Sequence, residues 1–305
     1  MYDLIIIGGG PAGLTSGLYA ARARLDTLLL EKTSLGGAII TTDKIENYPG
    51  FPEGIGGYEL MQKIESQARL FGLSTESEII KEIERENNIF KIIGESKTYL
   101  AKTLIIASGT TSAKLGIPGE KEYRGKGVSY CATCDALFFK NKPVAVIGGG
   151  DAAVEEGIYL TKFANKVYLI HRRDKLRATP ILQERAFANH KIEFVFDSIP
   201  EYIEGSDYVE KLVFKNIKTG NKKEIQVDGI FLYIGTLPNT VFLKDLLKLD
   251  EKGYIITDIN MKTEIPGLFA AGDVRAKALR QVSTAVGDGA TAAFMAEKYL
   301  ENDFK

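Results

Sequence analysis

Short apolar runs recur along this chain, each followed by a glycine-rich turn or by a stretch with polar positions interleaved. Residues 2–7 (YDLIII) and 27–30 (TLLL) form one pair of runs, and residues 143–147 (PVAVI) and 166–170 (KVYLI) form another. Apolar runs of this length without strict alternation are typical of strands buried on both faces of a parallel sheet. The pattern predicts two strand–turn–helix–strand units.

Each unit is followed by a run of shorter predicted strands. After the first come residues 78–84, 88–93 and 98–106, and this last run leads into a small-residue turn at Gly109. After the second come residues 191–196, 208–216, 222–227 and 230–235. The same order of elements appears twice, which indicates a faint internal repeat and two related nucleotide domains.

The closing segment is expected to complete the first unit. Residues 246–305 are too few for a domain of their own. They contain a strand that runs into Gly272-Asp273, followed by a long alanine-rich helix at about 280–301. An aspartate at such a strand end can accept hydrogen bonds from the hydroxyl groups of a cofactor.

The predicted fold class is α/β, with two Rossmann-like dinucleotide-binding domains, the second inserted into the first. The first domain is expected to comprise residues 1–113 and 244–305, and the second residues 114–243. Residues 111–118 and 236–244, each with a proline, would form a hinge of two paired strands.

The first turn carries a dinucleotide fingerprint. Gly8, Gly10 and Gly13 have the spacing GxGxxG, with Pro11 and Ala12 at the start of the expected helix. The first glycine permits the tight turn, the second a close approach of pyrophosphate, and the third close packing of helix on strand. The pyrophosphate would then lie at a helix N-terminus, where free N–H groups favour anions.

Glu31 ends the next strand, where an acidic side chain is expected to accept hydrogen bonds from an adenosine ribose. Gly37 and Asn47, in the glycine- and threonine-rich loop 33–52, and Gly109 are further candidates for contacts to this cofactor. A plain surface connection is the other interpretation of that loop.

The second turn repeats the fingerprint as GxGxxA. Gly148, Gly150 and Ala153 carry the spacing, and Asp151 and Ala152 open the helix. These residues predict a second nucleotide site.

The position that corresponds to Glu31 holds His171, so the acid is missing from the second site. Arg172 and Arg173 follow directly, with Arg177 one turn further on. A carboxylate would repel a ribose 2′-phosphate, whereas guanidinium groups pair with phosphate in a bidentate way. We therefore expect NADPH at this site; a solvated basic helix start is the alternative, and His171 is expected to be a packing or phosphate-edge residue.

Composition excludes several classes of protein. The 305 residues contain 39 basic and 40 acidic side chains, so no basic excess indicates nucleic-acid binding. The apolar N-terminus lacks a basic leader and runs into glycines, and no apolar run has the length of a membrane span. The sequence predicts a soluble cytoplasmic protein. Two histidines and two cysteines do not form a credible zinc site, and no metal is expected.

Both cysteines of the chain lie in one short motif, Cys131-Ala132-Thr133-Cys134-Asp135. Two thiols at this spacing can close into a disulfide and reopen, which makes them a redox couple. Asp135 is a candidate proton donor because a carboxyl group in an apolar site has a raised pKa; a helix cap is its alternative role. Residues 137–139 (LFF) behind the thiols form either core or an exposed patch for a protein partner.

Over essentially its whole length, the sequence resembles the low-molecular-weight, bacterial-type thioredoxin reductases. The fingerprint residues, the His-Arg-Arg cluster and Ala271-Gly272-Asp273 with Arg280-Gln281 carry the resemblance. The CATCD motif directly before the second fingerprint is its most specific part.

The resemblance implies FAD in the first domain, NADPH in the inserted domain, thioredoxin as the partner and a homodimer. It further implies that Cys134 faces the flavin, that Cys131 attacks the thioredoxin disulfide, and that Asp135 is the general acid–base. Asp273, Arg280 and Gln281 would hold FAD. A rotation about the hinge strands would let dithiol and nicotinamide use the same flavin in turn.

The chain departs from the resembled family at Ala38, where many members have glutamine. This change raises the alternatives of another donor, such as ferredoxin, a deazaflavin or NADH. A peroxiredoxin system as acceptor and a flavin dithiol oxidase are further rivals. The intact arginine cluster favours NADPH over these donors and over the oxidase.

Overall fold

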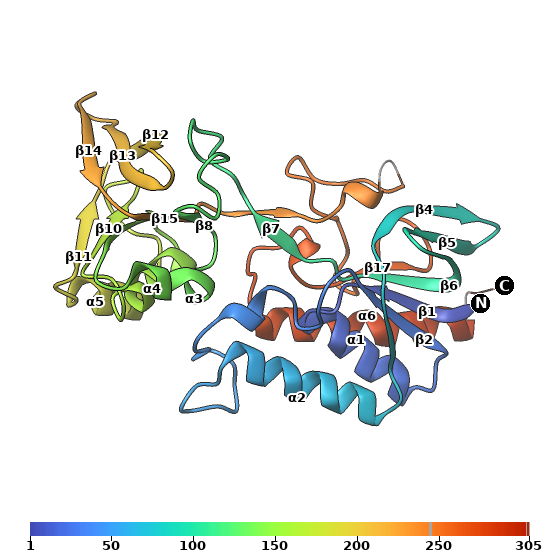
Figure 1. Ribbon diagram of the computed structural model, residues 1–305. Coiled ribbons are helices and arrows are strands. Elements are labelled where there is room, and N and C mark those ends of the chain that lie inside the picture. Colours follow the sequence, from blue (N-terminus) through green and yellow to red (C-terminus); the bar gives the residue numbers. More distant parts are fainter. Residues whose placement is uncertain (244–245, 303, 305) are drawn as a thin grey trace. The chain divides into compact units, whose positions relative to one another are not determined.

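The computed structural model describes residues 1–243, 246–302 and 304, and the chain divides into two compact units (Figure 1). Unit 1 comprises Met1–Thr111 and Leu237–Lys305, and unit 2 comprises Ser112–Thr236. Unit 2 therefore interrupts unit 1 in the sequence. Residue 244, where the sequence analysis expects the first domain to resume, lies outside the described residues.

Two short strands, β7 (Thr110–Ser112) and β16 (Thr236–Pro238), carry the chain into and out of unit 2. They pair as a two-stranded sheet. Next to them the Ala113 amide donates to the Gly235 carbonyl at 3.0 Å, and the Asn239 amide donates to the Gly109 carbonyl at 3.0 Å. The paired strands thus overlap the expected hinge stretches, but they are shorter, and β7 begins one residue before its stretch.

Unit 1 is built on a seven-stranded sheet in the order β3-β2-β1-β6-β5-β4, with β17 added beside β6. The strands are β1 (Tyr2–Ile7), β2 (Thr27–Glu31), β3 (Ser74–Ser77), β4 (Ile80–Glu86), β5 (Ile89–Gly94), β6 (Thr98–Ile106) and β17 (Leu268–Ala270). β1 pairs in parallel with β2 and β6, whereas β4, β5 and β6 pair antiparallel.

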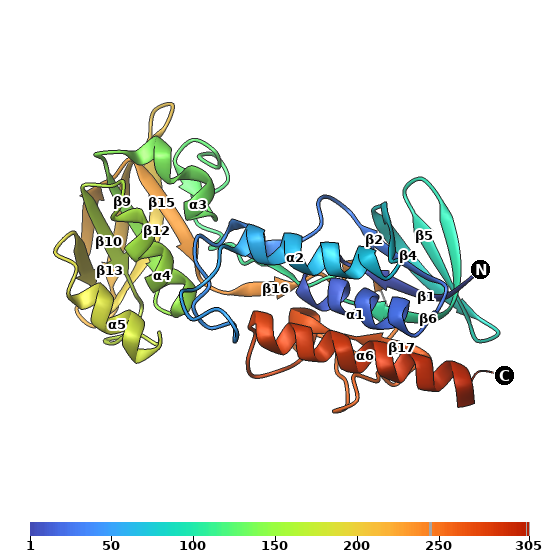
Figure 2. The same cartoon turned by 90° about the horizontal axis from the view of Figure 1, so that it is seen from below.

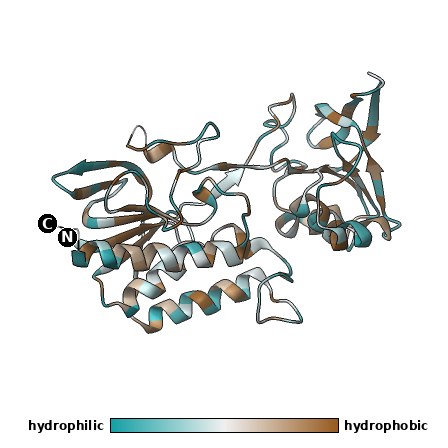
Figure 3. Ribbon diagram, turned by 180° about the vertical axis from the view of Figure 1, so that it is seen from behind, coloured by the Kyte–Doolittle hydropathy of each residue, from teal (hydrophilic) through white to brown (hydrophobic). Residues whose placement is uncertain are grey.

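The β1 side chains show how this sheet is buried on both faces. Leu4 and Ile6 pack in one apolar cluster with the helices, and Ile5 and Ile7 pack in a second cluster with the β4–β5 hairpin and the closing segment. The helices are α1 (Pro11–Arg22), α2 (Gly57–Leu70) and α6 (Val282–Asn302), with a 3₁₀ turn at Gly37–Thr41. Figure 2, seen from below, shows the three helices in front of the sheet, and Figure 3 shows the central strands of the sheet as largely hydrophobic.

Unit 2 repeats this plan with a five-stranded parallel sheet in the order β11-β10-β9-β15-β8. Its strands are β8 (Val128–Ser129), β9 (Pro143–Gly148), β10 (Lys166–Ile170), β11 (Ile192–Val195) and β15 (Gly229–Tyr233). Its helices are α3 (Ala132–Asp135), α4 (Asp151–Leu160) and α5 (Pro180–Phe187), with a 3₁₀ turn at Ala136–Phe139. A separate antiparallel sheet comprises β12 (Ser198–Gly205), β13 (Val209–Asn216) and β14 (Lys222–Gln226).

The two faces of the β9 strand are again different. Val144 and Val146 pack with the helices, and Ala145 and Ile147 pack with the antiparallel sheet. The α/β class and the Rossmann-like order of elements predicted from the sequence are confirmed in both units.

Strand β4 begins two residues later than the apolar pattern predicts. Glu78, the expected first residue of a strand, lies just before β4 and is 5% exposed. Its Oε1 accepts hydrogen bonds from the amides of Ile79, Glu95 and Ser96 at 3.1, 2.9 and 3.1 Å. The carboxylate satisfies the backbone of the facing turn.

Among the described helices, none has both the length and the apolar character needed to cross a membrane.

Candidate active site

The two cysteines close a disulfide at the start of the short helix α3. The Cys131 and Cys134 sulfurs are 2.07 Å apart and the two Cα atoms 5.4 Å apart. Cys131 is the N-cap of α3, and its sulfur accepts a hydrogen bond from the Cys134 amide at 3.2 Å. The C-x-x-C spacing fits one helical turn, so the pair forms a small ring without a long loop.

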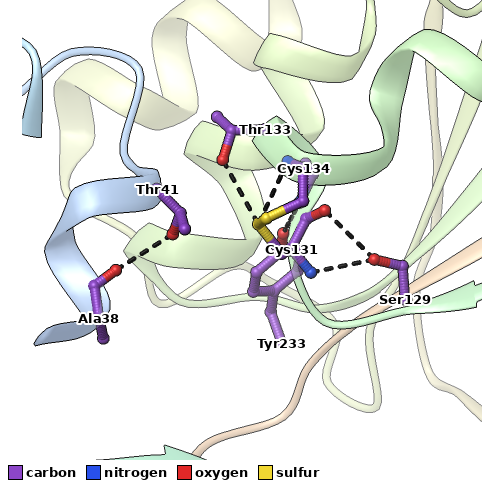
Figure 4. Close-up of a disulfide and its surroundings, with 8 residues drawn as sticks. Ala38, Thr41, Ser129, Cys131, Thr133, Cys134 and Tyr233 are labelled. Carbon is purple, nitrogen blue, oxygen red and sulfur yellow. Dashed lines mark hydrogen bonds between the residues drawn. A yellow bond between two sulfur atoms is a disulfide. The ribbon is translucent and has the colours of Figure 1, made fainter. Parts of the chain in front are cut away.

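Neighbouring strands hold this turn through its backbone (Figure 4). The Ser129 hydroxyl, at the end of β8, accepts from the Cys131 amide at 3.0 Å and donates to the Cys131 carbonyl at 3.2 Å. The Tyr233 hydroxyl, at the end of β15, accepts from the Ala132 amide at 2.8 Å. The position of the disulfide is thus set by the carboxyl ends of two adjacent strands.

Cys134 is exposed, and Cys131 and Asp135 are partly exposed. The three residues predicted to be catalytic therefore lie together in one turn of unit 2, and each of them is at least partly exposed. An accessible disulfide can undergo exchange with another thiol, whereas a buried one cannot.

The apolar cluster behind the thiols divides between surface and core. Leu137 and Phe138 are 71% and 75% exposed, whereas Phe139 is 8% exposed and packs edge-on against Phe231 with ring centroids 5.3 Å apart. Both interpretations of residues 137–139 are therefore correct for part of the segment. Two large apolar side chains remain on the surface within a few residues of the disulfide.

The first glycine-rich turn is closely packed. Gly8 has a φ of 109°, and a Cβ there would overlap the Ala107 carbonyl. A Cβ at Gly13 would overlap the Gly8 carbonyl, so only glycine lets α1 approach β1 this closely. The Glu31 Oε2 accepts from the Gly9 amide at 2.7 Å. The acid at the end of β2 thus also holds the turn itself.

A cavity of ≈ 490 Å³ opens beside this turn and lies entirely within unit 1. The sequence-predicted residues that line it are Gly8, Gly10, Pro11, Ala12, Glu31, Gly37, Gly109, Gly272, Asp273, Arg280 and Gln281. Gly13 is not a lining residue, because it lies against the Gly8 carbonyl behind the turn. Asn47 lies just outside it and donates from Nδ2 to the Gln281 Oε1 at 3.1 Å.

Asp273 gives this cavity an unusual electrostatic feature. Its Oδ1 is buried and has no hydrogen-bond partner among the described residues, and the Lys277 Nζ is 3.7 Å away, beyond hydrogen-bond distance. Burial raises the pKa of Asp273 above its usual value, although the charges of Lys277 and Arg280 oppose the rise. A buried carboxylate oxygen without a donor is costly, so it fits a ligand that brings a hydroxyl group.

Arg280 is fixed in place near Asp273. Its guanidinium lies 4.0 Å from the centroid of the Tyr254 ring, and it donates to the carbonyls of Asp273 and Arg275 at 3.2 and 3.0 Å. The cation is held by the backbone and an aromatic ring, and so it contributes a fixed positive charge to this side of the cavity.

Sequence reasoning missed several lining residues. Lys32, Thr33 and Ser34 directly follow Glu31 and could have been found from their place at a strand end. Asn239 carries no such signal: its Nδ2 donates to the Ser108 carbonyl at 2.9 Å, and its own carbonyl accepts from the Ser108 hydroxyl at 2.7 Å. This contact joins segments distant in the sequence.

The second glycine-rich turn lies between β9 and α4. Gly148, Gly150, Asp151 and Ala152 form the turn and the helix start, as the sequence predicts. The Asp151 Oδ1 accepts from the Thr179 amide at 2.7 Å, so it joins the starts of α4 and α5.

His171 covers the middle of this turn. It is 5% exposed, and its ring lies where a Cβ of Gly149 would be. Its Nε2 is buried without a hydrogen-bond partner among the described residues. Burial, together with the charges of Arg177, Arg173 and Arg172, lowers the pKa of His171, so the ring is neutral near pH 7. The expectation of a packing residue agrees with this placement.

The three arginines predicted to bind phosphate are exposed around His171. The electrostatic effect of each on His171 brings them into one cluster. Within the described part of the chain, no carboxylate forms an ion pair with Arg172, Arg173 or Arg177. The cluster therefore keeps its positive charge available for an anion.

Comparisons with known proteins agree with this geometry. A family model described as pyridine nucleotide-disulphide oxidoreductase matches residues 2–289. The thioredoxin reductase of Peptoclostridium acidaminophilum is 49% identical, with 100% of this chain and 99% of that protein aligned. Two solved thioredoxin reductases match over 99% of both chains, that of Lactococcus lactis with a TM-score of 0.97 at 49% identity and that of T. acidophilum with 0.95 at 36%. The chain belongs to the pyridine nucleotide-disulphide oxidoreductase family, and within it to the low-molecular-weight thioredoxin reductases.

Proposed function

We propose that this oxidoreductase reduces the disulfide of thioredoxin with electrons that pass from NADPH through FAD to Cys131 and Cys134. One observation carries the proposal: the only two cysteines of the sequence form a disulfide in an exposed turn, beside a surface of two large apolar side chains. A structural disulfide would need neither the exposure nor the neighbouring apolar surface.

The cavity of unit 1 is the proposed FAD site. The first glycine-rich turn would bind the pyrophosphate and Glu31 the adenosine ribose. The Asp273 Oδ1, which has no hydrogen-bond donor among the described residues, would bind a hydroxyl of the ribityl chain. Arg280 and Gln281 would line the same site, and Asn47 would orient Gln281. When bound, FAD supplies two-electron chemistry, since it can take up a hydride and give an electron pair to a disulfide.

The turn of unit 2 is the proposed NADPH site. Arg172, Arg173 and Arg177 would pair with the ribose 2′-phosphate, because none of them has a carboxylate partner among the described residues. The neutral His171 would support the turn from behind. This cluster favours NADPH over NADH, ferredoxin or a deazaflavin, and it argues against a dithiol oxidase that needs no nicotinamide.

In the proposed mechanism the two sulfurs have different roles. An electron pair breaks the Cys131–Cys134 bond, and one proton converts one thiolate to a thiol, with Asp135 as the proposed proton carrier. The Cys131 thiolate then attacks a thioredoxin sulfur and forms a mixed disulfide. Cys134 attacks the Cys131 sulfur of this mixed disulfide and releases the thioredoxin thiolate. Reduced thioredoxin leaves, and the Cys131–Cys134 disulfide is restored.

The proposed partner surface for thioredoxin is the pair Leu137 and Phe138, since these two large apolar side chains are exposed side by side next to the disulfide and exposed apolar patches often mark protein-interaction sites. We further propose a cytoplasmic homodimer, as the family resemblance implies. The paired strands β7 and β16 are the proposed hinge, about which the dithiol and the nicotinamide would take turns at the flavin. Cross-linking the two units should abolish turnover with thioredoxin; full turnover of the cross-linked protein would exclude the hinge.

The test is NADPH-dependent reduction of the host's own thioredoxins by the purified protein. Cys131→Ser and Cys134→Ser should each abolish thioredoxin reduction while NADPH still bleaches the flavin band in an anaerobic titration. NADH should bleach it only at much higher concentration. A parent protein whose flavin band NADPH fails to bleach would overturn the donor assignment, and bleaching without thioredoxin reduction would overturn the acceptor.

A further inference from the structure

Tyr233 lies at the carboxyl end of β15, next to the redox turn but far from it in the sequence. Its hydroxyl oxygen accepts the Ala132 amide at 2.8 Å. Figure 4 shows the hydroxyl directed toward Cys131. One side chain of the sheet therefore reaches the backbone beside the first cysteine of the disulfide.

Among the described residues, the hydroxyl proton of Tyr233 has no acceptor. A phenol can accept and donate at the same time, yet within the described residues the only hydrogen bond of this hydroxyl is the one it accepts. While the disulfide is closed, its sulfurs carry no charge that would attract this proton. A thiolate at Cys131 would be a strong acceptor in the same place.

A second tyrosine provides a comparison at the same turn. Tyr130 directly precedes Cys131, but its hydroxyl donates to the Glu120 Oε1 at 2.6 Å. The buried Glu120 also accepts the amides of Leu115 and Gly116 at 3.0 and 2.6 Å. The proton of Tyr130 is therefore already bound. The Tyr233 proton has no such acceptor among the described residues, and the Thr133 hydroxyl is a second possible donor, 3.5 Å from the Cys131 sulfur.

The surroundings of Tyr233 keep its proton on the oxygen. Burial and the nearby carboxylates of Glu156 on α4 and Asp135 on α3 raise the pKa of Tyr233 far above its usual value. The hydroxyl can therefore donate a hydrogen bond near pH 7 without losing the proton. A separate group must carry the proton that is taken up when the disulfide opens.

We propose that Tyr233 is a positioning residue for the redox reaction, which accepts the Ala132 amide and donates its free O–H to the Cys131 thiolate formed on reduction. Two electrons break the S–S bond and give two thiolates; one proton converts the Cys134 thiolate to a thiol, and the Cys131 thiolate remains, stabilised by the tyrosine. The inference rests on the redox disulfide of the proposed function, and it is independent of the electron donor and of thioredoxin.

The test isolates one thiol in the full-length protein. In a Cys134→Ser background, the rate of Cys131 alkylation by iodoacetamide is measured against pH, with and without Tyr233→Phe. Loss of a hydrogen bond to the thiolate should raise the apparent pKa of Cys131 by about one unit, which is about a tenfold loss of thiolate below that pKa. Tyr130→Phe is the matched control and should leave the profile unchanged.

A second variant keeps the shape of the site, so that misfolding cannot explain the result. Replacing Tyr233 by 3-fluorotyrosine makes the phenol a stronger donor, and the apparent pKa of Cys131 should fall. Unchanged profiles with both changes at Tyr233, or an equal shift with Tyr130→Phe, would overturn the inference. Because alkylation needs no NADPH, FAD or thioredoxin, a failure here is distinct from a failure to reduce thioredoxin.

Discussion

The two glycine-rich turns have the same backbone plan and opposite charge. In unit 1 the residue at the end of the second strand is Glu31, whose carboxylate accepts the Gly9 amide. In unit 2 the corresponding residue is His171, whose ring covers Gly149, while the Gly149 carbonyl accepts the amide of Arg177 at 2.6 Å. One position thus holds the turn in both units, by a charged hydrogen bond in the first and by packing in the second.

Under the proposed function, this difference would let one fold select two nucleotides. The glycines shape a turn that approaches a pyrophosphate, and they carry no information about the ribose. In the proposed function the strand-end residues carry that information, because a carboxylate suits a ribose hydroxyl and guanidinium groups without a carboxylate partner suit a phosphate. Substitutions at the turn should therefore affect folding, and substitutions at the strand end should affect the choice of ligand.

The largest expected difference in stability is between substitutions at Gly13 and at Ala153, the third fingerprint residues of the two turns. Gly13→Ala would place a Cβ into the Gly8 carbonyl, so we expect a loss of about 3 kcal/mol in the free energy of unfolding and loss of the flavin. Ala153→Gly removes only a methyl group at the start of α4 and should cost about 1 kcal/mol. Urea unfolding and the visible absorbance of the purified variants measure both. Equal losses in the free energy of unfolding for the two variants would mean that the third positions of the two turns are packed alike.

The next effect concerns the charge of the second site. Arg172→Ala, Arg173→Ala and Arg177→Ala should each raise the KM for NADPH by about tenfold to a hundredfold, because each removes a charge-assisted hydrogen bond of about 1.5–3 kcal/mol. The KM for NADH should not change, since NADH lacks the 2′-phosphate. Lys175→Ala, at an exposed cation of the same loop, is the control. An equal rise of the KM for NADH would show that the arginines support the structure of the site and do not bind the 2′-phosphate.

A smaller effect is expected at Glu31. Glu31→Ala removes the acceptor of the Gly9 amide and the proposed ribose ligand, and should weaken FAD binding by about tenfold, in line with a loss of about 1–2 kcal/mol. Glu31→Gln keeps an acceptor oxygen for the Gly9 amide and should lose less of the affinity for FAD. Flavin release during dilution measures the affinity. If Gln and Ala behave alike, the hydrogen bond to the turn is unimportant and the charge alone matters.

The smallest effect is a dependence of stability on pH. The pKa of His171 is lowered in the folded chain, while the unfolded chain has the usual value of about 6.5. Below that pH the unfolded chain binds more protons, so stability falls as the pH decreases, by at most about 1.4 kcal/mol per pH unit. His171→Gln should reduce the pH dependence of the free energy of unfolding, measured with urea between pH 6.5 and 5. His190→Gln, at an exposed ring, should leave that pH dependence unchanged.

The parts of the molecule that sequence could predict are those with local causes. The GxGxxG and GxGxxA spacings, the apolar runs and the C-x-x-C motif each determine a turn or a strand through their own residues, and the turns predicted from them lie where expected. Tyr233 and Asn239 were not predicted, because each acts through a contact with a distant segment. No local pattern of residues encodes such a contact.

The division of the 137–139 segment shows the same limit. The residues Leu-Phe-Phe fit either a core or a surface, and their sequence does not show that Phe139 packs against Phe231 of the distant strand β15. The later start of β4 has a similar origin, since Glu78 is bound to amides of the facing turn.

The interruption of unit 1 by unit 2 also imposes an order on biosynthesis. Helix α6 covers α1, with the Ser16 hydroxyl donating to the Gly289 carbonyl at 3.0 Å, yet α6 follows unit 2 and is the last of the described helices. On the ribosome, α1 emerges early and its α6-facing side stays uncovered until all of unit 2 has been made. Unit 2 is a continuous segment and can fold first. The second nucleotide unit in the sequence is therefore the first that can be completed in the cell.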